Sequence, residues 1–419
     1  MKALSISTDL PHISSPYQKK TYKDFNQTYP LCAFGLAFAF IYPNRTNAAK
    51  RCVIMSLMIT FSGGQLLWFI IYTSKCLYRG DILNFARNMT LAVIVTLFFV
   101  KTYYVIYATK KFAPLLFTMT KDLLKANELD KEYQKIYDEH IRQSKIAEIM
   151  WLFLPIALSA QFPIYAGIRM SIESMQSDVF TRRMVHDMEL LFVEDIQSET
   201  PFFECMFAYN CFQCIILVPN YCGFDGSFCI ATTHLRLKLK LMVHKVHRAF
   251  KNAKNKYELR QLITEAVKDH QNALQFYDEI QNLYSPWLFA VFMLTSFMIS
   301  FNLYQIYLVK PSELVDPKYT LFGLLGVFHI YLPCYYAATL TEVEIADDIY
   351  AAPWQNWADT SVTKTLMFMI AKAHQPLICT GWIVIFNMEL FKSIIQTSYS
   401  FFTLITVLYT SGFRTAKLL

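Results

Sequence analysis

Residues 286–309 read PWLFAVFMLTSFMISFNLYQIYLV, a run of 24 residues without one charged side chain. A helix of that length rises about 36 Å, which exceeds the ~30 Å hydrocarbon core of a bilayer. Backbone N–H and C=O groups inside a bilayer must bond to each other, and a helix achieves this within one segment. The run therefore predicts a transmembrane helix.

Similar runs occur on both sides of this one. Five are of comparable length, and a longer one, 386–411, contains many hydroxyl and amide side chains. Hydrophobic residues make up 54% of the chain and charged residues 17%, against about 45–50% and 25% in soluble domains. This composition argues against a soluble enzyme, and the 16% of aromatic residues argue against disorder. The sequence predicts an all-α membrane protein with seven transmembrane helices, of which the other five cover 52–74, 90–108, 149–170, 203–230 and 319–339.

The distribution of basic residues predicts the orientation, because Lys and Arg are retained on the cytoplasmic side of a membrane. Of the 39 Lys and Arg residues, 27 fall in 1–51, 109–148, 231–285 and 340–385, and 9 fall in 75–89, 171–202, 310–318 and 412–419, on the opposite side. The N-terminus is therefore predicted to be cytoplasmic and the C-terminus extracellular. The net charge of +7 reflects this topology, so no nucleic-acid partner is expected.

The spans divide the chain into regions. Leu31–Tyr42, with 12 residues before Pro43, is too short to cross and predicts an interfacial or re-entrant helix. Met1–Pro30 lacks the apolar segment of a signal peptide. The predicted order is a cytoplasmic N-terminal segment with the interfacial helix (1–51), helices one to four (52–230), a cytoplasmic helical extension (231–285), helices five and six (286–339), a cytoplasmic anchor helix (340–385), the seventh helix (386–411) and an extracellular tail (412–419).

The segments between the spans allow several interpretations. The outer segment 171–202 carries seven acidic residues against two arginines, which suits either an acidic vestibule that gathers cations or a solvated loop. Amphipathic stripes in 231–285 and 342–375 predict helices that need apolar partners. Those partners are another subunit, the same chain or, for the basic stretch His234–Phe250, a membrane surface.

No catalytic or cofactor-binding motif is present. The patterns GxGxxG, GxxxxGK[ST], GxSxG and HExxH do not occur. His244 and His247 lie among Lys and Arg side chains that repel a metal cation, and the Cys211–Cys214 pair lies within an apolar span. We expect neither enzyme activity nor a cofactor. Cys76 and Cys205 both fall near the outer surface, and whether they pair is left open.

Two charged residues lie within predicted spans, Lys101 in the second and Asp225 in the fourth. A charge at the centre of a membrane helix costs about 2.5–3.5 kcal/mol on insertion scales. Either the two side chains pair inside the bundle, or Lys101 extends to the membrane surface.

The last span has a distinctive face. Steps of three and four residues place polar side chains toward its inner half and aliphatic side chains toward its outer end. Several copies around an axis would enclose a hydrated tube that narrows to an apolar ring, which can gate by dewetting. The alternative is helix–helix packing through small polar residues. The residues of this face are Ser393, Gln396, Ser400, Thr403, Leu404 and Val407.

Several motifs of this chain resemble those of insect odorant receptors. IYAAPW at 349–354 and KSIIQTSYSFFTL at 392–404 are similar to the C-terminal signature of that family. Asp225, followed by His234 and His270, resembles its fourth span and inner loop, and Phe34–Pro43 its N-terminal segment. The inner loop is shorter than that of the shared co-receptor, so the chain resembles a tuning subunit.

This resemblance implies a function. The family forms tetrameric, odorant-gated, nonselective cation channels, in which a tuning subunit combines with the co-receptor in the plasma membrane of olfactory sensory neuron dendrites. The cytoplasmic helices would anchor the subunits to each other. The family's hydrophobic gate falls on Leu404 and Val407, and valine stands where the co-receptor has a polar residue.

The resemblance also implies a pocket for a volatile organic odorant in the outer half of spans two, three, four and six. Depth and helical face select mostly apolar and aromatic side chains, which suit a volatile ligand. The residues selected are Ile94, Phe98, Ser159, Phe162, Tyr209, Phe212, Gln213, Phe322, Leu325 and His329.

Three other functions are alternatives to this one. A gustatory receptor of the same superfamily would differ mainly in ligand polarity. A metabotropic seven-helix receptor should have its N-terminus outside and commonly carries DRY-like and NPxxY motifs, which are missing here. A transporter usually shows paired broken helices, whereas the sequence predicts a break in one span only, at Pro219 and Gly223, with no counterpart in a second half.

The predicted topology can be tested with epitope tags. An N-terminal tag should be stained only after the cells are permeabilised and a C-terminal tag in intact cells, because the basic segments hold the N-terminus inside. The sequons at Asn26 and Asn44 should then remain unglycosylated. An N-terminal tag that is visible on intact cells would contradict the topology and favour a metabotropic receptor.

Overall fold

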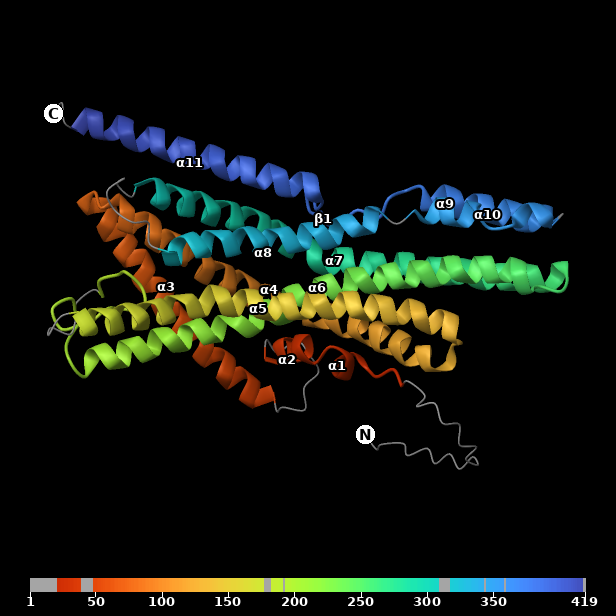
Figure 1. Cartoon of the computed structure of the whole chain (residues 1–419), viewed down its shortest axis with the longest axis horizontal. Coiled ribbons are helices and arrows are strands. Elements are labelled where there is room, and N and C mark those ends of the chain that lie inside the picture. The colour runs from red at the N-terminus through yellow and green to blue at the C-terminus, as the bar shows by residue number, and fades with distance from the viewer. Residues whose placement is uncertain are drawn as a thin grey trace.

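The computed structural model describes residues 21–38, 48–176, 182–190, 193–308, 317–342, 344–357 and 359–416. Long helices α4 to α8 run side by side along the long axis of the molecule, α3 crosses them obliquely, and α11 lies along one side (Figure 1). The elements are α1 Phe25–Thr28, α2 Pro30–Phe38, α3 Ala48–Arg79, α4 Ile82–Lys125, η1 Ala126–Glu128, α5 Lys131–Gln176, α6 Phe202–Asn252, α7 Lys256–Leu308, α8 Pro317–Thr341, α9 Ile345–Tyr350, η2 Trp354–Asn356, α10 Thr360–Ala373, β1 Thr380–Gly381, β2 Val384–Ile385 and α11 Met388–Ala416.

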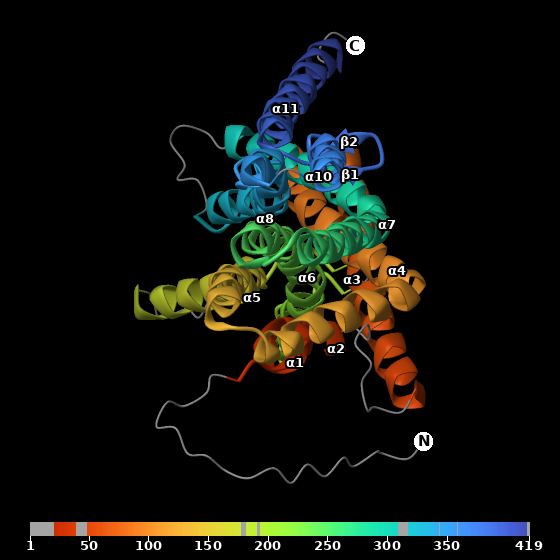
Figure 2. The same cartoon turned by 90° about the vertical axis from the view of Figure 1, so that its right-hand side faces the viewer.

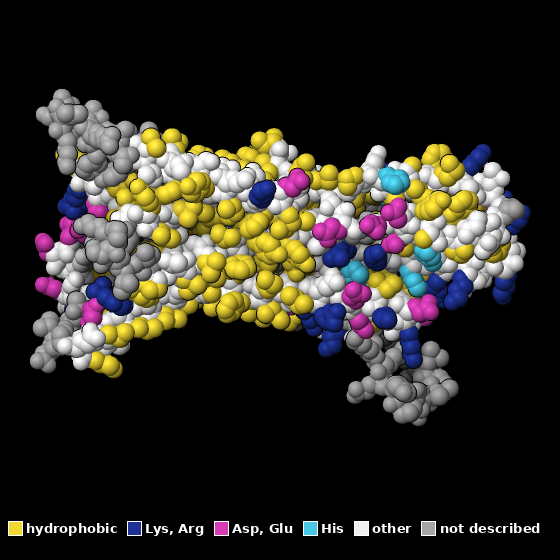
Figure 3. Space-filling view, turned by 45° about the horizontal axis from the view of Figure 1, so that its top comes forward, with side chains coloured by type: hydrophobic (Ala, Val, Ile, Leu, Met, Phe, Trp, Pro, Cys, Tyr) yellow, Lys and Arg dark blue, Asp and Glu magenta, His cyan; other side chains and the backbone are white. Residues whose placement is uncertain are grey.

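The all-α membrane fold predicted from the sequence is confirmed. Within the described residues, six helices are long and apolar enough to cross a membrane, and they correspond to α3 through α8. Helix α11 is the further long helix over the seventh predicted span. On the face shown in Figure 3, apolar side chains form a broad band across the middle of the bundle. Charged side chains lie at both ends, and many of them gather toward the end that holds α9, α10 and the turn between α6 and α7.

Several helices begin at residues that cap them. The side chain of Asp81 accepts a hydrogen bond from the backbone N–H of Asn84 at the start of α4, and Asp359 accepts two at the start of α10. Asn387 does the same for Leu390 at the start of α11. A capping side chain satisfies a backbone donor that has no partner within the helix, so these three residues set where the elements begin.

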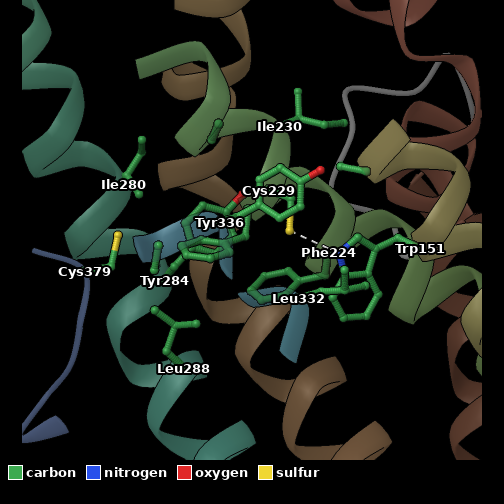
Figure 4. Close-up of a cluster of buried hydrophobic side chains, with 14 of the residues drawn as sticks. Trp151, Phe224, Cys229, Ile230, Ile280, Tyr284, Leu288, Leu332, Tyr336 and Cys379 are labelled. Carbon is green, nitrogen blue, oxygen red and sulfur yellow. Dashed lines mark hydrogen bonds between the residues drawn. The ribbon is translucent and has the colours of Figure 1, made fainter. Parts of the chain in front are cut away.

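Helices α6 and α7 continue well beyond the apolar spans and form an antiparallel pair. Their stripe of apolar residues is buried within this chain, and it includes Leu259, Ile263, Phe276 and Ile280. At the level where the pair enters the bundle, Phe224, Tyr284, Tyr336 and Trp151 form an aromatic core, with the Trp151 indole N–H donating to the Cys229 sulfur (Figure 4). For these residues, the apolar partners are in the same chain.

The short N-terminal helix packs into the bundle. Cys32 and Leu36 on α2 are fully buried, and Glu148 on α5 accepts hydrogen bonds from the N–H groups of Leu31 and Cys32. A Cβ added to Gly35 would lie 2.5 Å from the backbone nitrogen of Gly223 on α6, so α2 and α6 meet backbone to backbone. The rest of the predicted segment, 39–42, lies outside the described residues.

The segment 340–385 differs from the single anchor helix predicted for it. It contains α9, α10 and a two-stranded antiparallel hairpin in which Gly381 pairs with Val384. Trp382, in the hairpin turn, has φ of 55° and its ring stacks on Phe289 of α7 at 5.3 Å. A Cβ at Gly381 would lie 2.8 Å from the Phe289 nitrogen. The chain is therefore not helical where this turn packs on α7. The periodicity of apolar residues in the sequence does not indicate such a contact.

Lys101 and Asp225 form an ion pair in the interior of the bundle. The Lys101 Nζ lies 2.6 Å from Asp225 Oδ2, and the two side chains are 0% and 3% exposed. The other carboxylate oxygen accepts a hydrogen bond of 2.8 Å from the Trp287 indole on α7. The ammonium also lies 3.6 Å from the centre of the Tyr221 ring. Of the two interpretations left open by the sequence, the structure shows the buried pair.

We expect the Lys101→Met variant to be strongly destabilised, since it leaves the Asp225 carboxylate buried without its cation. Breaking such a pair costs about 3–5 kcal/mol, whereas replacing both partners with uncharged groups is often tolerated. The melting temperature of the detergent-solubilised protein should therefore fall for Lys101→Met and recover in Lys101→Met/Asp225→Asn. Lys110→Met, on an exposed turn of α4, is the matched control. Equal stability of the single and double variants would contradict this account.

Candidate functional site

An apolar cavity lies among α3 to α8. Residues of six helices and of the outer segment surround it, which places it at the centre of the bundle. Helices α4, α5, α6 and α8 supply most of its walls, through residues that include Leu91, Ile94 and Leu97, Pro155 and Phe162, Gln213 and Tyr221, and Phe322 and His329. The remaining walls come from Gln65 and Phe69 on α3, from Leu294, Thr295 and Met298 on α7, and from His186. No Lys, Arg, Asp or Glu is among the described residues that line it.

The cavity has the size and surface of a site for a small apolar molecule. About 70 Å³ is accessible to the centre of a water-sized sphere, and a single water needs roughly 10–15 Å³ by the same measure. The rings of Phe162 and Phe322 meet edge to face at 5.5 Å. Rings packed in this way give an apolar ligand a large contact area at defined angles.

A second groove, near the cytoplasmic end predicted from the sequence, contrasts with this cavity. It lies between α4, α5, α6 and α7, and its walls include Lys121, Asp122, Lys238 and Asp269. Burying an apolar ligand among such charges would leave them without water. Of the two sites, the central cavity is the one that suits a volatile organic molecule.

The floor of the cavity contacts the buried ion pair. Tyr221 lies under the Lys101 ammonium, and the His329 Nε2 is 3.9 Å from Asp225 Oδ2. Trp287 on α7 donates a hydrogen bond from its indole N–H to Asp225. Two side chains of the cavity wall therefore touch a charged pair that links α4, α6 and α7.

The side of the cavity that the sequence predicts to be extracellular is covered by residues 182–190. The carboxylate of Asp187 accepts hydrogen bonds from Lys318 Nζ at 2.7 Å and from the Tyr319 hydroxyl at 2.9 Å. The Asn88 amide donates to the backbone oxygen of Asp187 at 3.0 Å. These contacts hold the neighbouring His186 against the rings of Phe69 and Phe162. Since Asn88 is itself buried by this contact, the folded protein does not present that sequon for glycosylation.

Most acidic side chains of the outer segment are engaged with basic partners. Glu189 and Glu194 pair with Lys75, and Glu173 pairs with Arg183. These pairings favour a docked covering segment over an open acidic vestibule. Cys76 and Cys205 are free thiols in this structure.

The protonation states of the covering segment suit a neutral cavity. Burial, with the nearby Lys318, lowers the pKa of His186 to about 4, so its imidazole is uncharged at neutral pH. Burial raises the pKa of Asp187, but Lys318, Tyr319 and Arg87 outweigh this and hold its pKa below the usual value. Because the pKa of Asp187 is lower in the folded than in the unfolded protein, its ionised carboxylate stabilises the docked segment at pH values above the unfolded-state pKa. This stabilisation is lost as the pH falls through the lowered pKa.

The cavity brings together six of the ten residues selected from the sequence as ligand contacts: Ile94, Ser159, Phe162, Gln213, Phe322 and His329. The other four lie outside its lining. Phe98 is buried against Phe99, and the Tyr209 hydroxyl donates to the backbone oxygen of Phe61 on α3. Phe212 is 50% exposed on the outside of the bundle, and Leu325 packs on the core beside the cavity.

Sequence reasoning missed the contributions of α3, α7 and the outer segment. Gln65, Phe69, His186, Thr295 and Met298 all line the cavity. Gln65 is a polar residue in an apolar span and so could have been selected. His186 could not, because the fold of an irregular segment decides whether its side chains turn inward.

The face selected on α11 is turned away from the bundle of its own chain. Ser393, Gln396, Ser400, Leu404 and Val407 are exposed, and Thr403 is half-buried. The opposite face packs on α7, where the Ser398 hydroxyl donates to the Ser296 backbone oxygen at 3.2 Å and Phe401 lies against Phe297. Viewed along the bundle, α11 projects from one side (Figure 2).

The contacts of Asp187 predict what its neutralisation does. In Asp187→Asn the ion pair with Lys318 is lost, so residues 182–190 should open more often. Hydrogen exchange of their backbone amides, measured by mass spectrometry on the purified protein, should accelerate about tenfold, as a loss of ~1.4 kcal/mol implies. Asp195→Asn, at an exposed position of the same segment, is the matched control. Unchanged exchange in Asp187→Asn would show that this carboxylate does not hold the segment in place.

Comparison with known proteins identifies relatives of this chain. It is 24% identical to odorant receptor 10 of Aedes albopictus over 292 residues, 67% of this chain and 72% of that receptor. It is 25% identical to odorant receptor 47a of Drosophila melanogaster over 206 residues, 48% of this chain and 53% of that receptor. Against the second of these, the match spans about half of each protein.

The fold is also similar to a solved structure. The insect olfactory receptor OR5 from Machilis hrabei, determined in complex with eugenol, superposes with a TM-score of 0.73 over 90% of this chain and 97% of that one, at 16% identity. At that identity, the likeness shows a common fold. Residues 81–399 match the family described as 7tm Odorant receptor. This match covers most of the chain, which therefore belongs to the odorant receptor family.

Proposed function

We propose that this odorant receptor is the ligand-binding subunit of an odorant-gated, nonselective cation channel. The observation that carries the proposal is the uncharged cavity at the centre of the family fold. A volatile organic molecule gains apolar contact with most of its walls without displacing any buried charge. The six sequence-selected residues that line the cavity are the proposed ligand contacts, together with the α3, α7 and outer-segment residues beside them.

Helix α11 is the proposed wall of the pore. Exposed amide and hydroxyl groups gain nothing from lipid tails, so Gln396 and Ser400 are best accommodated by water or by another subunit. Leu404 and Val407, at 52% and 61% exposure, lie further along the same face. Around an axis shared with other subunits they would form an aliphatic ring, which excludes water when it is narrow.

The contacts of α7 supply a physical connection between cavity and pore. Trp287 bonds to Asp225 beside the cavity floor, and Ser296 and Phe297 contact α11. Thr295, between them, lines the cavity itself. An odorant that favours one arrangement of α7 would thereby favour one position of α11, to the extent of its differential affinity for the two.

The partner and location are proposed from the sequence. Val407 stands where the co-receptor of the family has a polar residue, so we propose that this chain conducts in a heteromer with the co-receptor. The assembly would lie in the plasma membrane of olfactory sensory neuron dendrites, with the N-terminus of each subunit in the cytoplasm. The distribution of basic residues given above supports this orientation.

Expression with and without the co-receptor tests the function. Odorant panels applied to cells that express both chains should evoke cation currents that persist when G-protein signalling is blocked. Cells that express this chain alone should give little current. Large odorant currents from this chain alone would contradict the need for a partner, and currents that vanish with the G-protein block would contradict the channel.

The gate makes a second prediction. Leu404→Ser should wet the aliphatic ring and raise the current in the absence of odorant, because a hydroxyl there favours water in the constriction. Phe402→Ser is the matched control: Phe402 lies against Tyr307 and Tyr399, away from the exposed face. Surface expression of both variants is measured alongside. If the two variants have the same resting current, the proposed pore face is incorrect.

A further inference from the structure

The cavity contains polar atoms that its apolar walls leave unpaired. Gln65 Oε1, Gln213 Nε2, His186 Nδ1 and His329 Nε2 are buried and have no hydrogen-bond partner among the described residues. All four residues line the cavity, and each is at least nine-tenths buried. A buried polar group without a partner is unfavourable in a folded protein, and such groups in native structures commonly meet a ligand or an ordered water.

Three of these groups lie on one side of the cavity. On α3, Ser62, Gln65 and Phe69 follow at helical spacing and so share one face. The Ser62 hydroxyl donates to Gln213 at 3.0 Å, Gln65 approaches the sulfur of Met188 at 4.0 Å, and Phe69 lies against His186. The two amides therefore lie beneath residues 182–190, on the same side of the cavity as the His186 imidazole of that segment. We call Gln65, Gln213 and His186 the outer polar cluster.

The amides of this cluster keep an unpaired atom in either orientation. Exchanging the oxygen and nitrogen of Gln213 would still leave Ser62 bonded to one of its two amide atoms, so the other amide atom remains for a ligand. A neutral imidazole also offers one donor and one acceptor. The outer polar cluster can accordingly both donate to an oxygen and accept from a hydroxyl.

The fourth group is differently placed. His329 lies at the cavity floor, where its Nε2 is 3.9 Å from Asp225 and its ring packs between Tyr221 and Trp151. At that distance the carboxylate is not a hydrogen-bond partner, so the floor holds one of the four unpaired atoms and the opposite side holds three. Of the two ends of the cavity, the outer one has the greater unmet demand for a hydrogen-bonding ligand.

Resting on the proposed function, we infer that the ligand of this receptor is an uncharged volatile that carries one hydrogen-bonding oxygen, as an alcohol, phenol, aldehyde or ketone does. The oxygen lies against Gln65, Gln213 and His186, and the hydrocarbon part lies against Phe162 and Phe322. A carboxylate or an ammonium group is excluded, since no charged side chain lines the described part of the cavity to pair with it. A plain hydrocarbon leaves the cluster unpaired.

Pairs of volatiles with the same shape test this inference. The probes are cyclohexanol with methylcyclohexane, cyclohexanone with methylenecyclohexane, phenol with toluene, and benzaldehyde with styrene. Currents are recorded from the receptor expressed with the co-receptor. In each pair to which the receptor responds, the oxygen-bearing member should be several-fold to about tenfold more potent, the change that one net hydrogen bond gives.

Two variants assign the preference to the outer polar cluster. Gln213→Met and Gln65→Met keep side-chain length but remove the hydrogen-bonding amide, so each should lower the potency of the oxygenated members about tenfold and leave the hydrocarbons equal or improved. Leu217→Met, at a lining position one turn along α6, is the matched control and should shift both members of a pair by the same factor. Surface expression and the response to a direct co-receptor agonist establish that each variant has assembled.

The outcomes separate this inference from the proposed function. Hydrocarbons as potent as their oxygenated partners, or a preference that survives both glutamine variants, would overturn the inference while odorant-evoked currents remained. A preference lost in His329→Leu but kept in both glutamine variants would overturn the assignment to the outer cluster. No current from any volatile, in cells that respond to the co-receptor agonist, would instead overturn the proposed function.

Discussion

The pairing of Lys101 with Asp225 is the constraint on which the rest of the bundle depends. Two charges at 2.6 Å with almost no exposure are stable inside an apolar bundle only while both are present and their remaining bonds are met. The Trp287 indole donates a hydrogen bond to the Asp225 carboxylate, and the Tyr221 ring lies against the Lys101 ammonium. Helices α4, α6 and α7 are thereby fixed to one another at a single depth, and the cavity opens directly beside that point.

This position gives the cavity its character. Its floor is formed by side chains that touch the ion pair, and its outer side by a segment held through Asp187 and Lys318. Both charged contacts lie just outside the lining, so the interior stays neutral while its two ends are fixed electrostatically. The same α7 that bonds to Asp225 carries α11 on its far side. Occupation of the cavity and the position of α11 are thus connected by one continuous helix.

The sequence predicted the helices well because transmembrane spans are read from length and apolarity, which leave few alternatives in a bilayer. It predicted six cavity residues because those residues lie on helical faces that repeat at a known spacing. The sequence did not predict features that depend on tertiary contacts. Phe212 follows the same spacing but faces outward, His186 reaches the cavity from an irregular segment, and the hairpin around Trp382 interrupts an expected helix. None of these three positions is specified by periodicity alone.

The accessibility of position 404 tests the connection between cavity and α11 most directly. In a Cys205→Ser background, which removes an exposed thiol, a Leu404→Cys variant is expressed with the co-receptor and treated with a water-soluble thiol reagent. The account predicts that an activating odorant accelerates modification at 404 and leaves modification in a Phe402→Cys variant unchanged. A rate at 404 that is the same with and without odorant would show that ligand binding does not open this part of α11 to water, and would contradict the account.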